Sequence, residues 1–139
     1  MKITDLKAPG EIFASAITTS EIELNNYGEV TFLIESGEGT AGNTTITVEG
    51  KAGDTGTSSA VTFLFAEKGS SEFVEVSSTG KQISIGGTTG ASKYFLVKVT
   101  ANSLASKEFD RVVLKTTTVT SSTVPGAIYA ISDKPRFSE

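Results

Sequence analysis

The sequence predicts an all-β domain, an antiparallel β-sandwich or jelly-roll-like fold of about eight or nine strands. Three observations lead to this fold class. Apolar and polar residues alternate along most of the chain, which is the pattern of half-buried strands. Threonine and serine are abundant, with 20 Thr and 17 Ser among 139 residues, and β-branched threonine packs well on the solvent-facing side of a sheet. Glycine-rich breaks separate the alternating runs, as the turns of such a fold require.

The elements follow from this pattern in order. Residues 1–13 alternate poorly and contain Pro9-Gly10, so we expect an extended N-terminal arm followed by one β-sandwich domain over residues 14–139. A short tail is expected from Asp133, because Pro135 has no N–H to donate within a central strand. One helical turn is expected at Ala101–Lys107. Strands are expected at Ile22–Leu24, Glu29–Ser36, Thr45–Glu49, Val61–Phe65, Ile83–Ile85, Tyr94–Val99, Val112–Thr120 and Ile128–Ala130.

The composition excludes much of catalytic chemistry. The chain has no histidine and no cysteine, which removes the Ser-His-Asp triad, thiolate nucleophiles, zinc and iron–sulfur ligation, and disulfides. We therefore expect a protein that is not an enzyme and that needs no cofactor. A net charge of −4 and a pI near 4.9 disfavour nucleic acid as a partner, because an acidic surface repels phosphates. No apolar run is long enough to cross a membrane and no secretory signal is visible, so no membrane association is expected.

Two short motifs match known patterns in the wrong context. Gly37–Gly42 reads G-x-G-x-x-G, but a strand pattern follows it where a dinucleotide-binding loop needs a helix, so a hairpin loop is the better interpretation. Asp54-Thr55-Gly56 matches the aspartic protease triplet. It lies in a polar, glycine-rich segment rather than in an apolar strand, which favours a turn.

Other side chains are candidate binding groups. Glu35, Glu38, Glu49 and Asp54 supply the oxygen ligands that Ca²⁺ prefers, but no known loop spacing connects them, so they are interpreted as solvated charges. The aromatic residues of the predicted strands could stack on a sugar, although such positions are usually core; these residues are Phe63, Phe65, Tyr94 and Phe95. Arg111 is expected to form a cross-strand pair, with an interface contact as the alternative.

Four segments carry a resemblance to a known family. They are Asn25–Gly37, Thr45–Glu49, Lys93–Val99, and Ala127–Ile131 followed by Pro135-Arg136-Phe137. Together they resemble the strand patterns of small β-rich virion proteins of tailed bacteriophages, typically encoded beside the major capsid protein. The similarity extends over roughly residues 18–137.

The resemblance implies a capsid cement, or decoration, protein located in the virion and made in the cytoplasm of the bacterial host. Its expected partners are the major capsid protein and further copies of itself, in a homodimer or homotrimer. The alternatives are another virion component (tail, connector or head fibre) and a carbohydrate-binding or immunoglobulin-like module. Apolar anchors and arms carry such contacts, and the candidate interface residues are Ile3, Leu6, Ile12, Phe13, Arg136 and Phe137.

Overall fold

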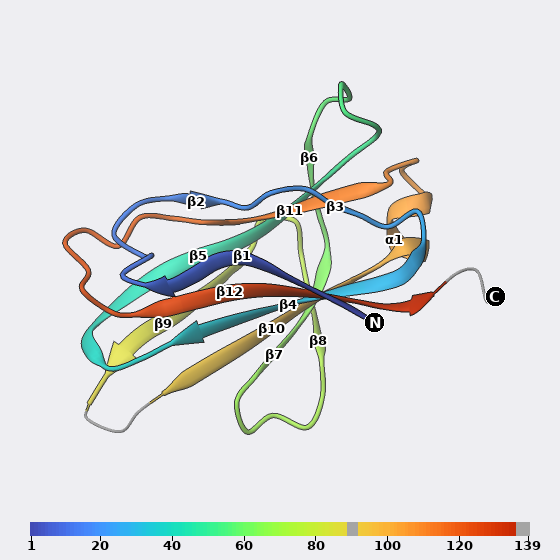
Figure 1. Cartoon of the computed structure of the whole chain (residues 1–139). Helices are drawn as coiled ribbons and strands as arrows, with labels where there is room; N and C mark the ends of the chain where they lie inside the picture. The colour runs from blue at the N-terminus through green and yellow to red at the C-terminus, as the bar shows by residue number, and fades with distance from the viewer. Residues whose placement is uncertain (89–91, 136–139) are drawn as a thin grey trace.

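The computed structural model describes residues 1–88 and 92–135, which form two antiparallel β-sheets packed face to face (Figure 1). Sheet A has the strand order β1-β12-β4-β10-β7-β8. Sheet B has the order β2-β11-β5-β6, and β3 and β9 extend it along β11 and β5. The predicted all-β antiparallel sandwich is thereby confirmed. The strands are β1 (Lys2–Gly10), β2 (Ile17–Thr18), β3 (Ile22–Glu23), β4 (Tyr27–Ser36), β5 (Gly39–Lys51), β6 (Ser59–Val61), β7 (Phe63–Glu67), β8 (Val74–Val76), β9 (Lys81–Gly87), β10 (Lys93–Thr100), β11 (Arg111–Thr116) and β12 (Gly126–Pro135).

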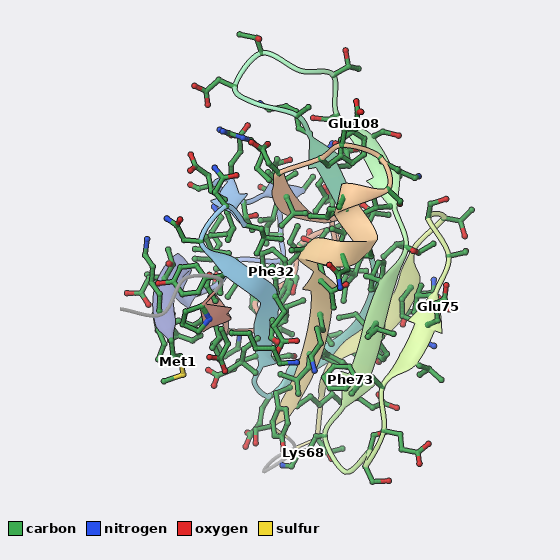
Figure 2. The ribbon with its side chains drawn as sticks, turned by 90° about the vertical axis from the view of Figure 1, so that its right-hand side faces the viewer. Met1, Phe32, Lys68, Phe73, Glu75 and Glu108 are labelled. Atoms are coloured by element: carbon green, nitrogen blue, oxygen red, sulfur yellow. The ribbon has the colours of Figure 1, made fainter. Side chains whose placement is uncertain are left out.

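The core lies between the sheets and is built from the inward half of each alternating run. On β4, Val30, Phe32 and Ile34 are fully buried, and Phe32 lies among the packed side chains in Figure 2. On sheet B, Val48 and Leu114 are equally buried and lie opposite each other on neighbouring strands. Burial of these aliphatic and aromatic side chains is the main source of stability for the sandwich.

The predicted helical turn is present as α1 (Ala101–Ala105), directly after β10. Thr100 caps it, since the Thr100 hydroxyl accepts a hydrogen bond from the Ser103 amide at 3.2 Å. Leu104 is 1% exposed and fixes the helix to the core. The cap and this single buried leucine explain why so short a helix is stable here.

The N-terminal segment is not a free arm. Lys2–Gly10 forms β1, the edge strand of sheet A, which pairs antiparallel with β12. Its register shifts between Asp5 and Lys7 and again before Gly10, and these irregularities hid the strand from the alternation pattern. The boundary expected after residue 13 therefore does not separate an arm from the sandwich.

Three further expectations are corrected. Gly37–Gly42 is not a hairpin loop, because β4 belongs to sheet A and β5 to sheet B; the segment crosses between the sheets, and the Gly37 amide donates to the Pro125 carbonyl at 2.8 Å. The last strand continues to Pro135, opposite Tyr27, where a tail was expected. The described residues contain twelve strands rather than eight or nine, because β1, β2 and β8 were not expected and the strand expected at Val61–Phe65 is divided between β6 and β7.

Candidate interaction surface

The outer face of sheet A carries a row of apolar side chains. Leu33 of β4 lies directly opposite Leu96 of β10 on one side and opposite Tyr129 of β12 on the other. In the adjacent row, Ile131 of β12 lies opposite Ile3 of β1. With Leu64 of β7 these residues form what we call the apolar stripe: Ile3, Leu33, Leu64, Leu96, Tyr129 and Ile131.

The apolar stripe points away from the core. Side chains alternate between the faces of a strand, and the inward neighbours Phe32, Val97 and Ala130 are fully buried. The stripe residues are half-buried by their cross-strand neighbours, except Ile3, which is 60% exposed. A contiguous apolar surface on a sheet face is typical of a protein contact site.

The outer face of sheet B is polar. Asn43 pairs with Ser84, and Thr45 pairs with Gln82. Further along β5, Glu49 forms an ion pair with Lys115, whose ammonium lies 3.3 Å from the carboxylate. Hydroxyl, amide and paired charged groups of this kind are typical of a solvated face. The contrast between the two faces selects sheet A as the candidate interaction surface.

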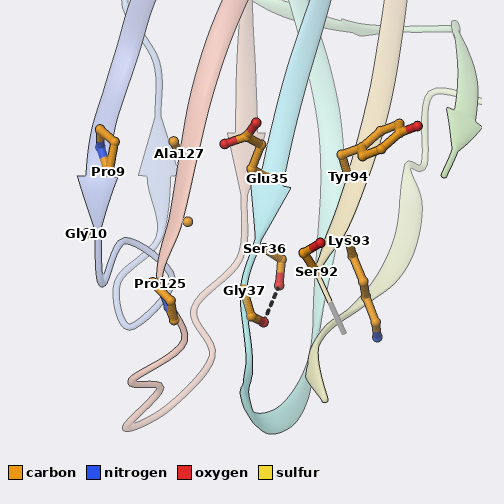
Figure 3. A pocket seen from close by; sticks show the side chains of 11 residues that line it. Pro9, Gly10, Glu35, Ser36, Gly37, Ser92, Lys93, Tyr94, Pro125 and Ala127 are labelled. Carbon is orange, nitrogen blue, oxygen red and sulfur yellow. Dashed lines mark hydrogen bonds between the residues drawn. The ribbon is translucent and has the colours of Figure 1, made fainter. Parts of the chain in front are cut away.

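A groove of about 330 Å³ lies at one end of this face, where β1 ends and β12 begins. Figure 3 shows that Glu35 of β4 and Tyr94 of β10, which are direct cross-strand partners, border it together. Pro9 and Pro125 form its apolar walls, while Gly10, Gly37, Gly126 and Ala127 contribute little or no side chain. We call this hollow the end groove.

A cluster of charges surrounds Arg111 on sheet B. The Arg111 guanidinium is within 3.2 Å of Glu21 and 3.6 Å of Glu23, and its Nε is 3.3 Å from Asp110. Asp54, from the connection between β5 and β6, also pairs with Arg111, and Lys51 pairs with Glu21. The sequence predicted a cross-strand pair for Arg111, and the register places Glu23 opposite it. Asp110 is the neighbour of Arg111 in the chain, and Asp54 is the partner that comes from a different connection.

These contacts shift three pKa values. Hydrogen bonding from Lys51, and then from Arg111, lowers the pKa of Glu21. The backbone N–H of Gly53, which donates to Asp110 at 2.9 Å, lowers the pKa of that carboxyl group, and Arg111 adds to the effect. The hydrogen bond to Glu21 raises the pKa of Arg111 above its ordinary value. The cluster is thus a set of satisfied ion pairs rather than a poised acid or base.

The candidate interface residues differ in how far they are exposed to solvent. Ile3 is exposed and belongs to the apolar stripe. Leu6 and Ile12 are half-buried and pack against the core. Phe13 is fully buried, so it cannot contact a partner at the surface of this fold. Arg136 and Phe137 lie outside the described residues.

The structure also shows where the candidate sugar-stacking and metal-binding residues lie. Phe63, Phe65 and Phe95 are core residues, and the rings of Phe65 and Phe95 stack with centroids 6.1 Å apart; Tyr94, at 42%, is exposed. Glu35 and Glu49 lie on different sheets. Within residues 1–88 and 92–135, no three acidic side chains gather as they would around a metal ion. The same part of the chain contains no helix able to cross a membrane.

Sequence reasoning missed Leu33, Leu96, Tyr129 and Ile131 as surface residues. The signal for Leu33 and Leu96 was visible, because apolar residues occupied both faces of the predicted strands at Glu29–Ser36 and Tyr94–Val99. In a two-layer sandwich only one face of each strand reaches the core. Apolar residues at the opposite positions are therefore evidence for a contact surface.

Fold and surface together define the class: a small antiparallel β-sandwich with one apolar and one polar outer face. No family model matches the chain, and no curated protein matches it. Among solved structures, the chain is similar to the SPBc2 prophage-derived protein YomS, with a TM-score of 0.54 and 14% sequence identity over 95% of this chain and 92% of that protein. At this identity the similarity concerns the fold.

Proposed function

We propose that this protein is a virion structural component of a tailed phage, and specifically a capsid decoration protein that binds the major capsid protein through the outer face of sheet A. The observation that carries the proposal is the apolar stripe, with Leu33, Leu96 and Tyr129 in one cross-strand row. The strand segments that resemble phage virion proteins support the role, and so does a fold shared with a prophage-derived protein. The proposed function is binding to the capsid, without catalysis.

The experiment is co-sedimentation of the purified protein with capsids assembled from the major capsid protein of the same phage genome. Leu96→Ser removes an apolar group from the centre of the stripe and is expected to weaken binding about tenfold or more, as a buried interface anchor does. Val113→Ser is the matched control, because Val113 is half-buried on the outer face of sheet B, opposite Glu49. It should bind like the wild type.

One outcome would reject the decoration role, and another would reject the docking face. Failure of the wild type to sediment with capsids would reject the decoration role outright, and electron microscopy of virions with the labelled protein would then show whether it occupies a tail, connector or head fibre. Equal loss of binding in Leu96→Ser and Val113→Ser would reject sheet A as the docking face. Self-association as a dimer or trimer stays a prediction, which sedimentation equilibrium tests.

The carbohydrate-binding alternative loses most of its proposed platform. Three of its four aromatic residues, Phe63, Phe65 and Phe95, are in the core. A sugar platform requires exposed rings, and of these four only Tyr94 is exposed.

A further inference from the structure

The end groove combines an aromatic ring and a carboxylate on adjacent strands. Tyr94 and Glu35 are cross-strand partners, a relation that places Cβ atoms about 5 Å apart on the same face. Both side chains are exposed, Tyr94 at 42%. An exposed tyrosine beside an exposed carboxylate offers a stacking surface and an anionic acceptor to one ligand group.

No cation of the described residues pairs with the Glu35 carboxylate. None of the ion pairs formed within residues 1–88 and 92–135 includes Glu35. The lysine that lines the groove, Lys93, donates instead to the Ser84 carbonyl of β9 at 3.3 Å, and Figure 3 shows its side chain directed away from Glu35. Among the described residues, the Glu35 carboxylate is therefore open to a cation from another molecule.

The rest of the outer face of sheet A carries further carboxylates. Asp5 lies at the end of the row formed by Tyr129, Leu33 and Leu96, and Glu75 lies opposite Leu64. In the described part of the chain neither carboxylate forms an ion pair. The cation at the centre of the face, Lys98, lies over the Phe73 ring at 4.3 Å. A second copy docked through this face would bring carboxylates against carboxylates, which disfavours self-pairing.

We infer that the end groove binds an arginine side chain of the protein that docks on sheet A, with the guanidinium stacked on Tyr94 and paired with Glu35. A planar guanidinium stacks on an aromatic ring and also donates to a carboxylate in fork geometry. The apolar walls formed by Pro9 and Pro125 suit the aliphatic stem of the same side chain. The inference deepens the proposed function, since it names the chemistry of the partner at the same face.

The first test uses a small probe and does not depend on capsids. Acetyl-arginine N-methylamide is titrated into the ¹⁵N-labelled protein, and amide shifts are followed by NMR; acetyl-citrulline N-methylamide is the neutral isostere. We expect shifts at Glu35 and Tyr94 with arginine and at least threefold weaker binding of citrulline, as loss of an exposed ion pair gives. Equal binding of both probes, no binding of arginine, or shifts confined to other surfaces would overturn the inference.

Variants locate the two contacts. Glu35→Gln and Tyr94→Leu should each weaken arginine binding about threefold to fivefold, while Glu75→Gln, a matched neutralisation at the opposite edge of sheet A, should leave it unchanged. An equal effect of Glu75→Gln would mean that overall charge, rather than the groove, attracts the cation. That result would contradict the assignment of the site.

The capsid assay then connects the groove to docking. Glu35→Gln should reduce capsid binding about fivefold at 50 mM NaCl and by less at 500 mM, because salt screens exposed pairs. If wild type does not bind capsids, the decoration role fails while the probe titration still decides the groove. If the wild type forms a dimer that Leu96→Ser abolishes, a second copy occupies the face and the inference is overturned.

Discussion

The ring of Phe13 packs against the backbone of Gly126 at the first residue of β12. A Cβ atom at Gly126 would lie 2.9 Å from Phe13 Cζ and 2.6 Å from the Glu35 carbonyl oxygen, so the strand can approach only because this residue is glycine. Phe13 is fully buried. Phe13 thereby fixes the segment between β1 and β2 to the core, together with the half-buried Ile12.

Both partners of this contact are predicted to be essential for stability. Phe13→Ala should lower the free energy of unfolding by about 3–5 kcal/mol through loss of burial and a residual cavity. Gly126→Ala should cost about 1–3 kcal/mol by overpacking. Urea denaturation followed by circular dichroism measures both. Ile3→Ala is the control, and its 60% exposure predicts a change within about 0.5 kcal/mol.

Two N-terminal truncations should differ in stability, because only the longer one removes Phe13. Deleting residues 1–10 removes β1 with its half-buried Leu6 and should cost about 2 kcal/mol. Deleting residues 1–13 also removes Phe13 and should cost about 3–5 kcal/mol more. Equal stability of the two truncated proteins, measured by thermal and urea unfolding, would show that Phe13 does not anchor this segment.

A buried hydroxyl without a partner makes a third prediction. Thr116 is 4% exposed, and its Oγ1 finds no hydrogen-bond partner within the described residues. Thr116→Val replaces the hydroxyl by a methyl group of similar size and should raise stability by about 1 kcal/mol. Thr44→Val is the opposite case, because the Thr44 hydroxyl donates to the Thr117 carbonyl at 2.8 Å. It should lose about 1 kcal/mol, and a gain there would contradict the argument.

The strands that face the core were predictable because their signal is local. On β4, the alternation of Val30, Phe32 and Ile34 with Thr31 and Glu35 already separates the buried positions from the outer ones. Period-two patterning needs no knowledge of neighbouring strands. The same local logic failed for β1, where register shifts interrupt the alternation.

The candidate site was less predictable because its residues meet only through long-range register. Leu33, Leu96 and Tyr129 come from three strands far apart in the sequence, and no local pattern states that β4 lies between β10 and β12. Glu35 and Tyr94 become partners only when that order is known. Phe13 was assigned to the surface because a lone phenylalanine in an irregular segment does not reveal the glycine against which it packs.

The charge cluster around Arg111 predicts the direction of the pH dependence. The pKa values of Glu21 and Asp110 are lower in the folded protein than their ordinary values of 4.5 and 3.8. At acid pH the unfolded chain therefore binds more protons than the folded one, and stability must fall as pH falls. The stability that these two carboxylates contribute is fully present at pH values above 4.5 and 3.8, respectively. It is lost as the pH falls below those values and passes through the lowered pKa values of the folded protein.

Arg111→Met should therefore destabilise the protein more at pH 7 than at pH 3. At neutral pH the variant leaves Glu21 and Asp110 charged without the Arg111 guanidinium, whereas toward pH 3 protonation of these two carboxylates reduces the repulsion between them. In the variant, the fall of stability toward acid pH should become less steep only in part. Lys51 still pairs with Glu21, and the Gly53 amide still donates to Asp110. Lys115→Met, which breaks the more exposed pair with Glu49, is the control with the smaller expected effect. Urea unfolding at both pH values measures the difference, and an effect of Arg111→Met that grows toward pH 3 would contradict the assigned direction.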